Sequence, residues 1–100
     1  PLVFVVCYDS NLSWKSKDGR DSGHWDASII ATHILLEATD LGLGSLWIGM
    51  FKPDVIREKL ELPENIIPVC ILPVGFATET SAPINLHDQR RPLSETVRFK

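Results

Sequence analysis

Three glycines in one short stretch have a spacing that could support ligand binding. Gly42, Gly44 and Gly49 lie between Leu41 and Phe51, where the pattern predicts a helix end, a short strand and the start of another helix. A glycine at 49 lets the backbone approach a flat ligand closely, and the N–H groups that follow lead towards a helix N-terminus, where donors are unpaired. The stretch could therefore offer backbone donors to a ligand's polar edge, although glycines at this spacing are also typical of simple turns.

A pair of arginines near the C-terminus, Arg90 and Arg91, is the second candidate. A guanidinium fork can bind a phosphate through two parallel hydrogen bonds, and Pro92 would stiffen the chain just beyond the pair. The alternative is a solvated pair of charges in a polar tail.

The remaining titratable residues favour no acid–base or metal site. His33 lies on the polar stripe of a predicted helix with Glu37 four residues on, which favours a surface or interface hydrogen bond. The loop carboxylates Asp9, Asp18 and Asp21 resemble solvated charges, since no regular structure holds a second carboxylate beside them. No Cys or His spacing indicates zinc, and Cys7 and Cys70 lie in apolar runs as buried thiols do.

The elements that would position these residues can be read from the pattern. Residues 2–8 are a β-branched and aromatic run, which predicts a central strand covered on both faces. A polar loop follows over residues 9–24. Residues 26–41 have helical periodicity, with Asp26 as the predicted N-cap and Gly42 as the left-handed residue that ends the helix.

The predicted helix has two apolar faces. One broad face contains Ala27, Ile30, Ala31, Ile34, Ala38 and Leu41. Ile29 and Leu36 form a second face on the other side. In a chain of 100 residues, the second face indicates that further polypeptide or another subunit covers it.

The rest of the chain predicts a short strand, a short helix, a longer strand and a tail. Residues 45–49 are strand-like, and Pro53 opens a helix that runs to about Leu60. Residues 66–76 are rich in β-formers, but Pro68 and Pro73 favour an edge position, a bulge, or a pairing that leaves these two sites outward. Residues 77–100 indicate an extended arm.

Composition restricts the class of protein. A hydrophobic content of 44% with 23% charged residues describes one globular unit. The net charge of −3 gives no attraction to nucleic acid, and the apolar runs are too short to cross a bilayer. The chain begins at Pro1, directly before a strand-like run, which suggests a fragment or a processed chain. Without disulfides or membrane spans we expect a cytoplasmic protein, provided that no export signal precedes this start.

The sequence resembles the C-terminal half of nitroreductases. Three stretches carry the resemblance in the same order and spacing: DASIIATHILLEATDLGLGSLWIGMF, VIREKLELPENIIPVCILPVGFATE and RRPLSETV. They cover nearly the whole chain, with the loop from Ser10 to Gly23 the least informative part. The resemblance implies an α+β fold with a mainly antiparallel sheet flanked by helices, incomplete here, in which residues 1–100 are half of one domain.

The resemblance also implies a cofactor and a set of residues that bind it. Nitroreductases hold FMN at a homodimer interface and reduce it with NAD(P)H. The segment along the flavin ring corresponds to Trp47, Ile48, Gly49 and Met50, with the amides of Gly49 and Met50 facing the N5 and O4 edge. Many relatives have glutamate where Gly49 stands, so only backbone can act there. Arg90, two residues before the proline, corresponds to the phosphate-binding arginine, and Arg91 adds positive potential.

The expected function is that of an FMN-dependent NAD(P)H oxidoreductase acting on nitroaromatics, quinones or similar flat acceptors by alternating half-reactions. A reductive dehalogenase or a flavin-modifying enzyme on the same fold is the nearest alternative, because the fold does not choose the acceptor. A non-catalytic dimerisation fragment is the alternative from another class, since the basic N-terminal segment that holds flavin in the family has no counterpart here.

Overall fold

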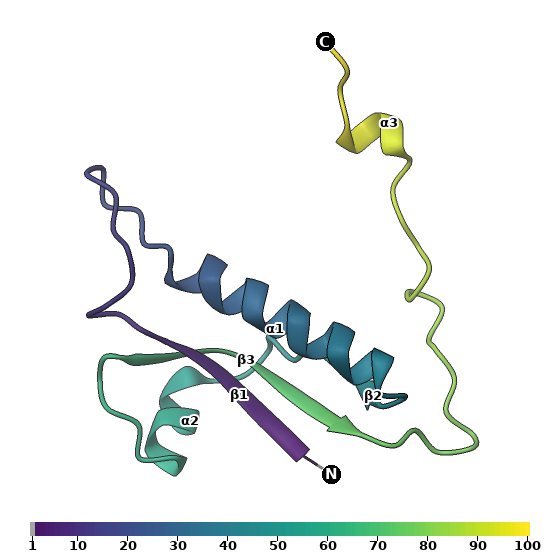
Figure 1. Cartoon of the computed structure of the whole chain (residues 1–100), viewed down its shortest axis with the longest axis horizontal. Helices are drawn as coiled ribbons and strands as arrows, with labels where there is room; N and C mark the ends of the chain where they lie inside the picture. Colours follow the sequence, from purple (N-terminus) through teal and green to yellow (C-terminus); the bar gives the residue numbers. More distant parts are fainter. Residues whose placement is uncertain (1) are drawn as a thin grey trace.

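The computed structural model describes residues 2–100, which form three strands and three helices (Figure 1). In chain order the elements are β1 (Leu2–Asp9), α1 (Gly23–Asp40), β2 (Gly44–Ser45), α2 (Pro53–Lys59), β3 (Ile66–Gly75) and α3 (Leu93–Thr96). Helix α1 lies along the sheet, and α2 packs against β3. The expected α+β architecture with an antiparallel sheet is confirmed.

The sheet has the order β1-β3-β2, so β3 is its central strand in the part of the chain described. Two expectations were therefore wrong: β1 lies at an edge of this sheet, with Leu2, Val3 and Phe4 exposed, and β3 does not. Two prolines in β3 remove only two donors from the ladder. The register shifts between Val6 and Cys7, opposite Pro68, so the bulge that was one of the predicted options is present.

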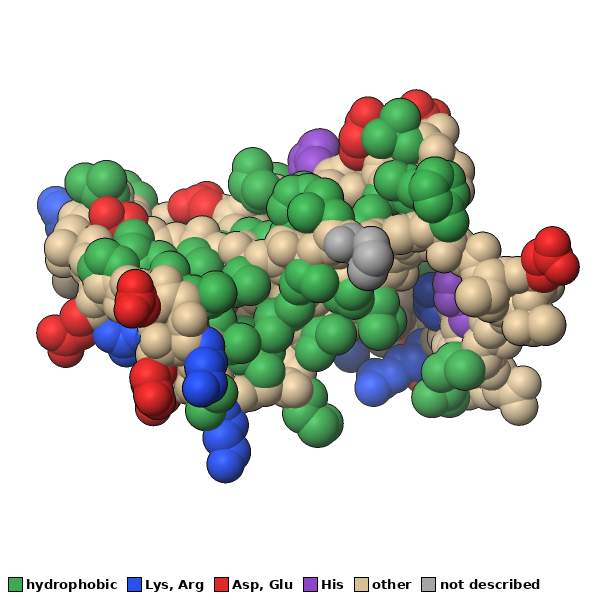
Figure 2. Space-filling view, turned by 90° about the horizontal axis from the view of Figure 1, so that it is seen from below, with side chains coloured by type: hydrophobic (Ala, Val, Ile, Leu, Met, Phe, Trp, Pro, Cys, Tyr) green, Lys and Arg blue, Asp and Glu red, His purple; other side chains and the backbone are tan. Residues whose placement is uncertain are grey.

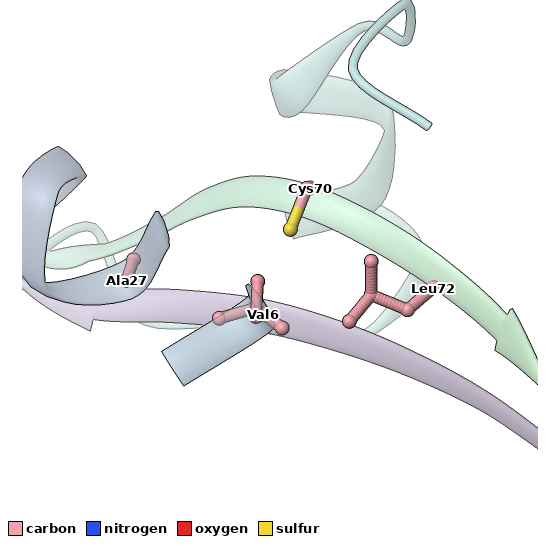
Figure 3. Packing of buried hydrophobic residues seen from close by; sticks show 5 residues of the cluster. Val6, Ala27, Cys70 and Leu72 are labelled. Carbon is pink, nitrogen blue, oxygen red and sulfur yellow. The ribbon is translucent and has the colours of Figure 1, made fainter. Parts of the chain in front are cut away.

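The core is small and lies between α1 and the β1–β3 pair (Figure 3). Its buried members are Val6 from β1, Ala27 and Ala31 from α1, and Cys70 and Leu72 from β3. Alternate residues of β3 are buried from Pro68 to Val74, as expected for a strand with one covered face. The small side chains of α1 let the helix backbone lie close to the sheet.

Helix α1 begins three residues earlier than Asp26, so the predicted N-cap was wrong. Its first free N–H, that of Gly23, donates to Asp21 Oδ1 at 2.8 Å, and this local acceptor allows the helix to start in the loop. Asp26 lies in the first turn, where its Oδ2 accepts from the Ser22 hydroxyl at 2.7 Å.

The predicted end of α1 is confirmed. Gly42 has a φ of +72°, its N–H donates to Thr39 O at 3.0 Å, and the Leu43 N–H donates to Ala38 O at 2.8 Å. This pair of bonds is a Schellman motif, which turns the chain from α1 into β2.

The chain exposes far more surface than a compact protein of its mass. Its accessible area is 8470 Å², against about 5,700 Å² expected for a folded monomer of 11.2 kDa. Figure 2 shows hydrophobic side chains spread across one face, and the second face of α1, with Ile29 and Leu36, is exposed. Nothing in residues 2–100 covers this apolar surface.

We predict that Gly23→Ala lowers the free energy of unfolding by about 1–3 kcal/mol. A Cβ at 23 would lie 2.1 Å from Tyr8 Cδ2 and 2.2 Å from Cε2, so the ring would have to move. Urea unfolding at neutral pH measures the change. Gly44→Ala is the control, because its new methyl would make contacts of 3.5 Å or longer; equal stabilities for the two variants would contradict the prediction.

Candidate functional site

The segment Trp47–Met50 lies between β2 and α2 and is held by one residue. Ile48 exchanges both backbone hydrogen bonds with Ile71 of β3, at 2.9 and 3.0 Å. The N–H groups of Gly49 and Met50 donate to no acceptor within residues 2–100. The chain thus anchors the segment at 48 and leaves two consecutive donors free beyond it.

Gly49 has an open face. Its backbone is not left-handed, and the nearest side-chain atom to a Cβ built there would be Trp47 Nε1, at 3.6 Å. Trp47 is about one-third exposed, at 36%, and Met50 is almost fully exposed. A flat ligand could therefore reach the backbone of Gly49 without displacing packed side chains.

The two arginines lie on the segment that follows β3 and leaves the body of the molecule (Figure 1). Arg90 Nη1 donates to two nearby backbone carbonyls, those of His87 at 2.9 Å and Gln89 at 2.8 Å. Helix α3, which follows the pair, packs on no other element. Within one chain the structure does not bring Arg90 or Arg91 onto the Trp47–Met50 segment.

An apolar groove of about 510 Å³ between α1 and the sheet was not predicted from the sequence. It is lined by Leu2, Phe4, Ile30, His33, Ile34, Glu37, Ala38, Leu41, Leu43 and Val74. His33 Nδ1 donates to Ile29 O at 2.8 Å, which confirms a hydrogen-bonding role for this histidine in place of an acid–base role. The groove contains none of the predicted site residues.

The loop carboxylates are held in their ionised form. Hydrogen bonds from Asn65 Nδ2 and the Asn11 N–H, each 2.8 Å long, lower the pKa of Asp9. The Gly23 N–H lowers the pKa of Asp21 in the same way, and the Ser16 hydroxyl lowers that of Asp18. Groups with lowered pKa values are poor proton donors at neutral pH, so the loop offers no general acid.

The remaining polar groups add no metal or thiol chemistry. Burial raises the pKa of both cysteine thiols, and neither forms a disulfide. Across the described part of the chain there is no cluster of potential metal ligands, and no helix is both long and apolar enough to span a bilayer. Arg57 of α2 is a feature that the sequence did not reveal, because its Nε is buried without a hydrogen-bond partner.

Comparison with known proteins identifies the family. The model of the nitroreductase family matches residues 1–76, which include every strand and both longer helices. The chain therefore belongs to the nitroreductase family. The match ends before Arg90 and Arg91, so it does not test the assignment of the arginines.

Similar proteins support this assignment. The chain is 34% identical over 97 residues to a protein of Methanothermobacter thermautotrophicus provisionally named NADH dehydrogenase/NAD(P)H nitroreductase, covering 91% of this chain and 48% of the relative. A nitroreductase family protein of Clostridium difficile 630 superimposes with a TM-score of 0.88 and 39% identity, over 100% of this chain and 59% of that one. An FMN-dependent nitroreductase of Clostridium difficile R20291 gives a TM-score of 0.59 and 32% identity, over 76% and 47%.

The chain spans about half the length of the curated relatives that it matches best. The nitroreductase fold is confirmed, and this chain has part of it. The shared part is the sheet with α1 and α2, and it includes the Trp47–Met50 segment.

We predict that Asp9→Asn flattens the acid side of the stability profile. Because the folded pKa of Asp9 lies below its unfolded value of about 3.9, its contribution is complete above that pH and is lost as pH falls through the folded pKa. Urea unfolding at pH 7 and pH 3 should show a smaller loss in the variant than in the wild type. Asp88→Asn, on the exposed segment after β3, is the control; identical losses for Asp9→Asn and the wild type would count against the clamp.

Proposed function

We propose that this chain is the part of an FMN-dependent NAD(P)H oxidoreductase that holds one edge of the flavin. The observation that carries the proposal is the pair of unpaired N–H donors at Gly49 and Met50, which follow a fixed residue in a chain of the nitroreductase family. Relatives named as NADPH-dependent oxidoreductases and as an FMN-dependent nitroreductase support the reaction class and the cofactor.

The residues present fit a flavin. Two free backbone donors suit the acceptor atoms N5 and O4, and the open face of Gly49 lets a planar ring approach the backbone. Ile48 is bonded to β3 at both of its backbone groups, so it would hold the segment in register. Arg90 forms hydrogen bonds to neighbouring carbonyls only, and it can exchange these for a phosphate, to which its charge is better matched.

The cofactor would supply the redox chemistry, accepting reducing equivalents from NAD(P)H and passing them to a nitroaromatic, a quinone or a similar flat acceptor in alternating half-reactions. The part of this chain is to bind and to orient. The amides of Gly49 and Met50 would stabilise negative charge on the flavin edge, and Trp47 would cover the ring beside them. No side chain of the segment is ionisable, so none of them transfers a proton.

A homodimer with flavin at its interface is part of the proposal. The surface of this chain exceeds that of a compact monomer by an area similar to a large subunit interface. Isolated apolar side chains on the segment after β3, such as Leu86, Leu93 and Phe99, have no packing partners in the described part of the chain. A partner subunit would cover them, and it would bring a second set of arginines towards a flavin. The cytoplasmic location stays a prediction.

The deciding experiment combines a visible absorption spectrum, an FMN titration and NAD(P)H oxidation on the purified chain. We expect flavin absorbance near stoichiometric amounts and FMN-dependent oxidation of NAD(P)H when a nitroaromatic or quinone is added. Absence of flavin together with no response to added FMN would overturn the proposal. A stable dimer that binds no FMN would favour the dimerisation fragment instead, and turnover of a halogenated substrate alone would favour the dehalogenase.

The arginine assignment predicts a phosphate-specific effect. Arg90→Ala should weaken FMN binding about tenfold to a hundredfold, the value of a charge-assisted hydrogen bond, and should barely alter the affinity for riboflavin, which lacks the phosphate. Arg91→Ala should have a smaller effect of the same kind. Fluorescence titration with both flavins measures this. Arg98→Ala, further along the same segment, is the control; an equal loss for FMN and riboflavin in Arg90→Ala would assign the arginine a purely structural role.

A further inference from the structure

The indole of Trp47 lies beside the open face of Gly49. A Cβ built on Gly49 would be 3.6 Å from Trp47 Nε1 and 4.0 Å from Cδ1, so the N–H edge of the ring borders the space that a side chain at 49 would fill. The indole N–H donates to no acceptor in residues 2–100, although nearly two-thirds of the residue's surface is covered. Tryptophan N–H groups usually find a partner when they become buried.

Three free donors therefore lie within four consecutive residues: the indole N–H of Trp47 and the backbone N–H groups of Gly49 and Met50. The segment has no acceptor side chain that could satisfy them, because Ile48, Gly49 and Met50 are apolar. A group of preorganised donors without internal partners is suited to an electron-rich edge on a ligand.

We propose that the indole N–H of Trp47 is a third hydrogen-bond donor to the flavin edge bound by Gly49 and Met50, and that it occupies the place which a side chain at 49 would otherwise take. This inference rests on the proposed function. It makes Trp47 a specific polar contact to the cofactor, where the sequence indicated only a ring packed near it or a core tryptophan. It also gives Gly49 a second role, since a side chain there would close the path to the indole nitrogen.

The other two tryptophans provide matched controls. Trp14 and Trp25 are 60% and 52% exposed, and they lie in the loop and the first turn of α1, away from the 47–50 segment in the sequence. Replacing each with phenylalanine removes the same N–H and the same ring area at sites with no proposed ligand.

The test uses Trp47→Phe, which keeps an aromatic ring but removes the donor. We expect FMN affinity to fall about threefold to tenfold, the value of one hydrogen bond, with a shift in the visible absorption of the bound flavin. The urea unfolding midpoint of the flavin-free protein should stay unchanged. Trp14→Phe and Trp25→Phe should bind FMN with wild-type affinity and spectrum.

Gly49→Ala is a second, independent variant. The backbone at 49 accepts alanine, and the new methyl would lie in ordinary contact with Trp47 Nε1, so the chain should fold while access to the indole N–H narrows. FMN affinity should again fall. In the Trp14→Phe/Trp25→Phe protein, whose one tryptophan is Trp47, FMN should quench the indole emission.

The outcomes separate this inference from the proposed function. If the wild type binds FMN but Trp47→Phe and Gly49→Ala leave its affinity and spectrum unchanged, the indole donor is disproved and the proposed function stands. If the wild type binds no FMN, both are overturned. A loss of affinity in Trp47→Phe that is matched by Trp14→Phe or Trp25→Phe would also disprove a specific role for Trp47.

Discussion

The fold depends on the close packing of α1 on the β1–β3 pair. Ala27 and Ala31 are almost fully buried against Val6, Cys70 and Leu72, and this small core is the main apolar contact between helix and sheet. It fixes β3, and β3 in turn fixes the Trp47–Met50 segment through the two bonds between Ile71 and Ile48. A disturbance of the helix–sheet contact would therefore reach the candidate site, although no residue of the core touches a ligand.

The division of roles within the site follows from this arrangement. Side chains at the core position the backbone, and the backbone at Gly49 and Met50 offers the donors. A site of this kind tolerates a variety of side chains as long as the chain path is kept, which suits a family that acts on different acceptors with the same cofactor. The acceptor must then be chosen by residues beyond the four in this segment.

Local signals in the sequence predicted much of the fold. The end of α1 at Gly42 and the start of α2 at Pro53 were predicted because a left-handed glycine and a first-turn proline act through local geometry. Sheet order was wrong, because it depends on which distant strand pairs with which, and prolines count only as a weak penalty. The free donors of the site could be named but not shown to be free, since that requires knowing every acceptor nearby.

The pairing of β1 with β3 has a consequence for how the chain folds. The two strands stand at opposite ends of the folded part of the sequence, with both longer helices between them, so closing this pair costs more loop entropy than forming α1 or α2. Contacts of this range form slowly. During synthesis β1 emerges first and waits for β3 to be made, as an apolar, β-branched segment with unsatisfied backbone groups. For that interval Leu2–Asp9 is the part of the molecule most prone to aggregate or to require a chaperone.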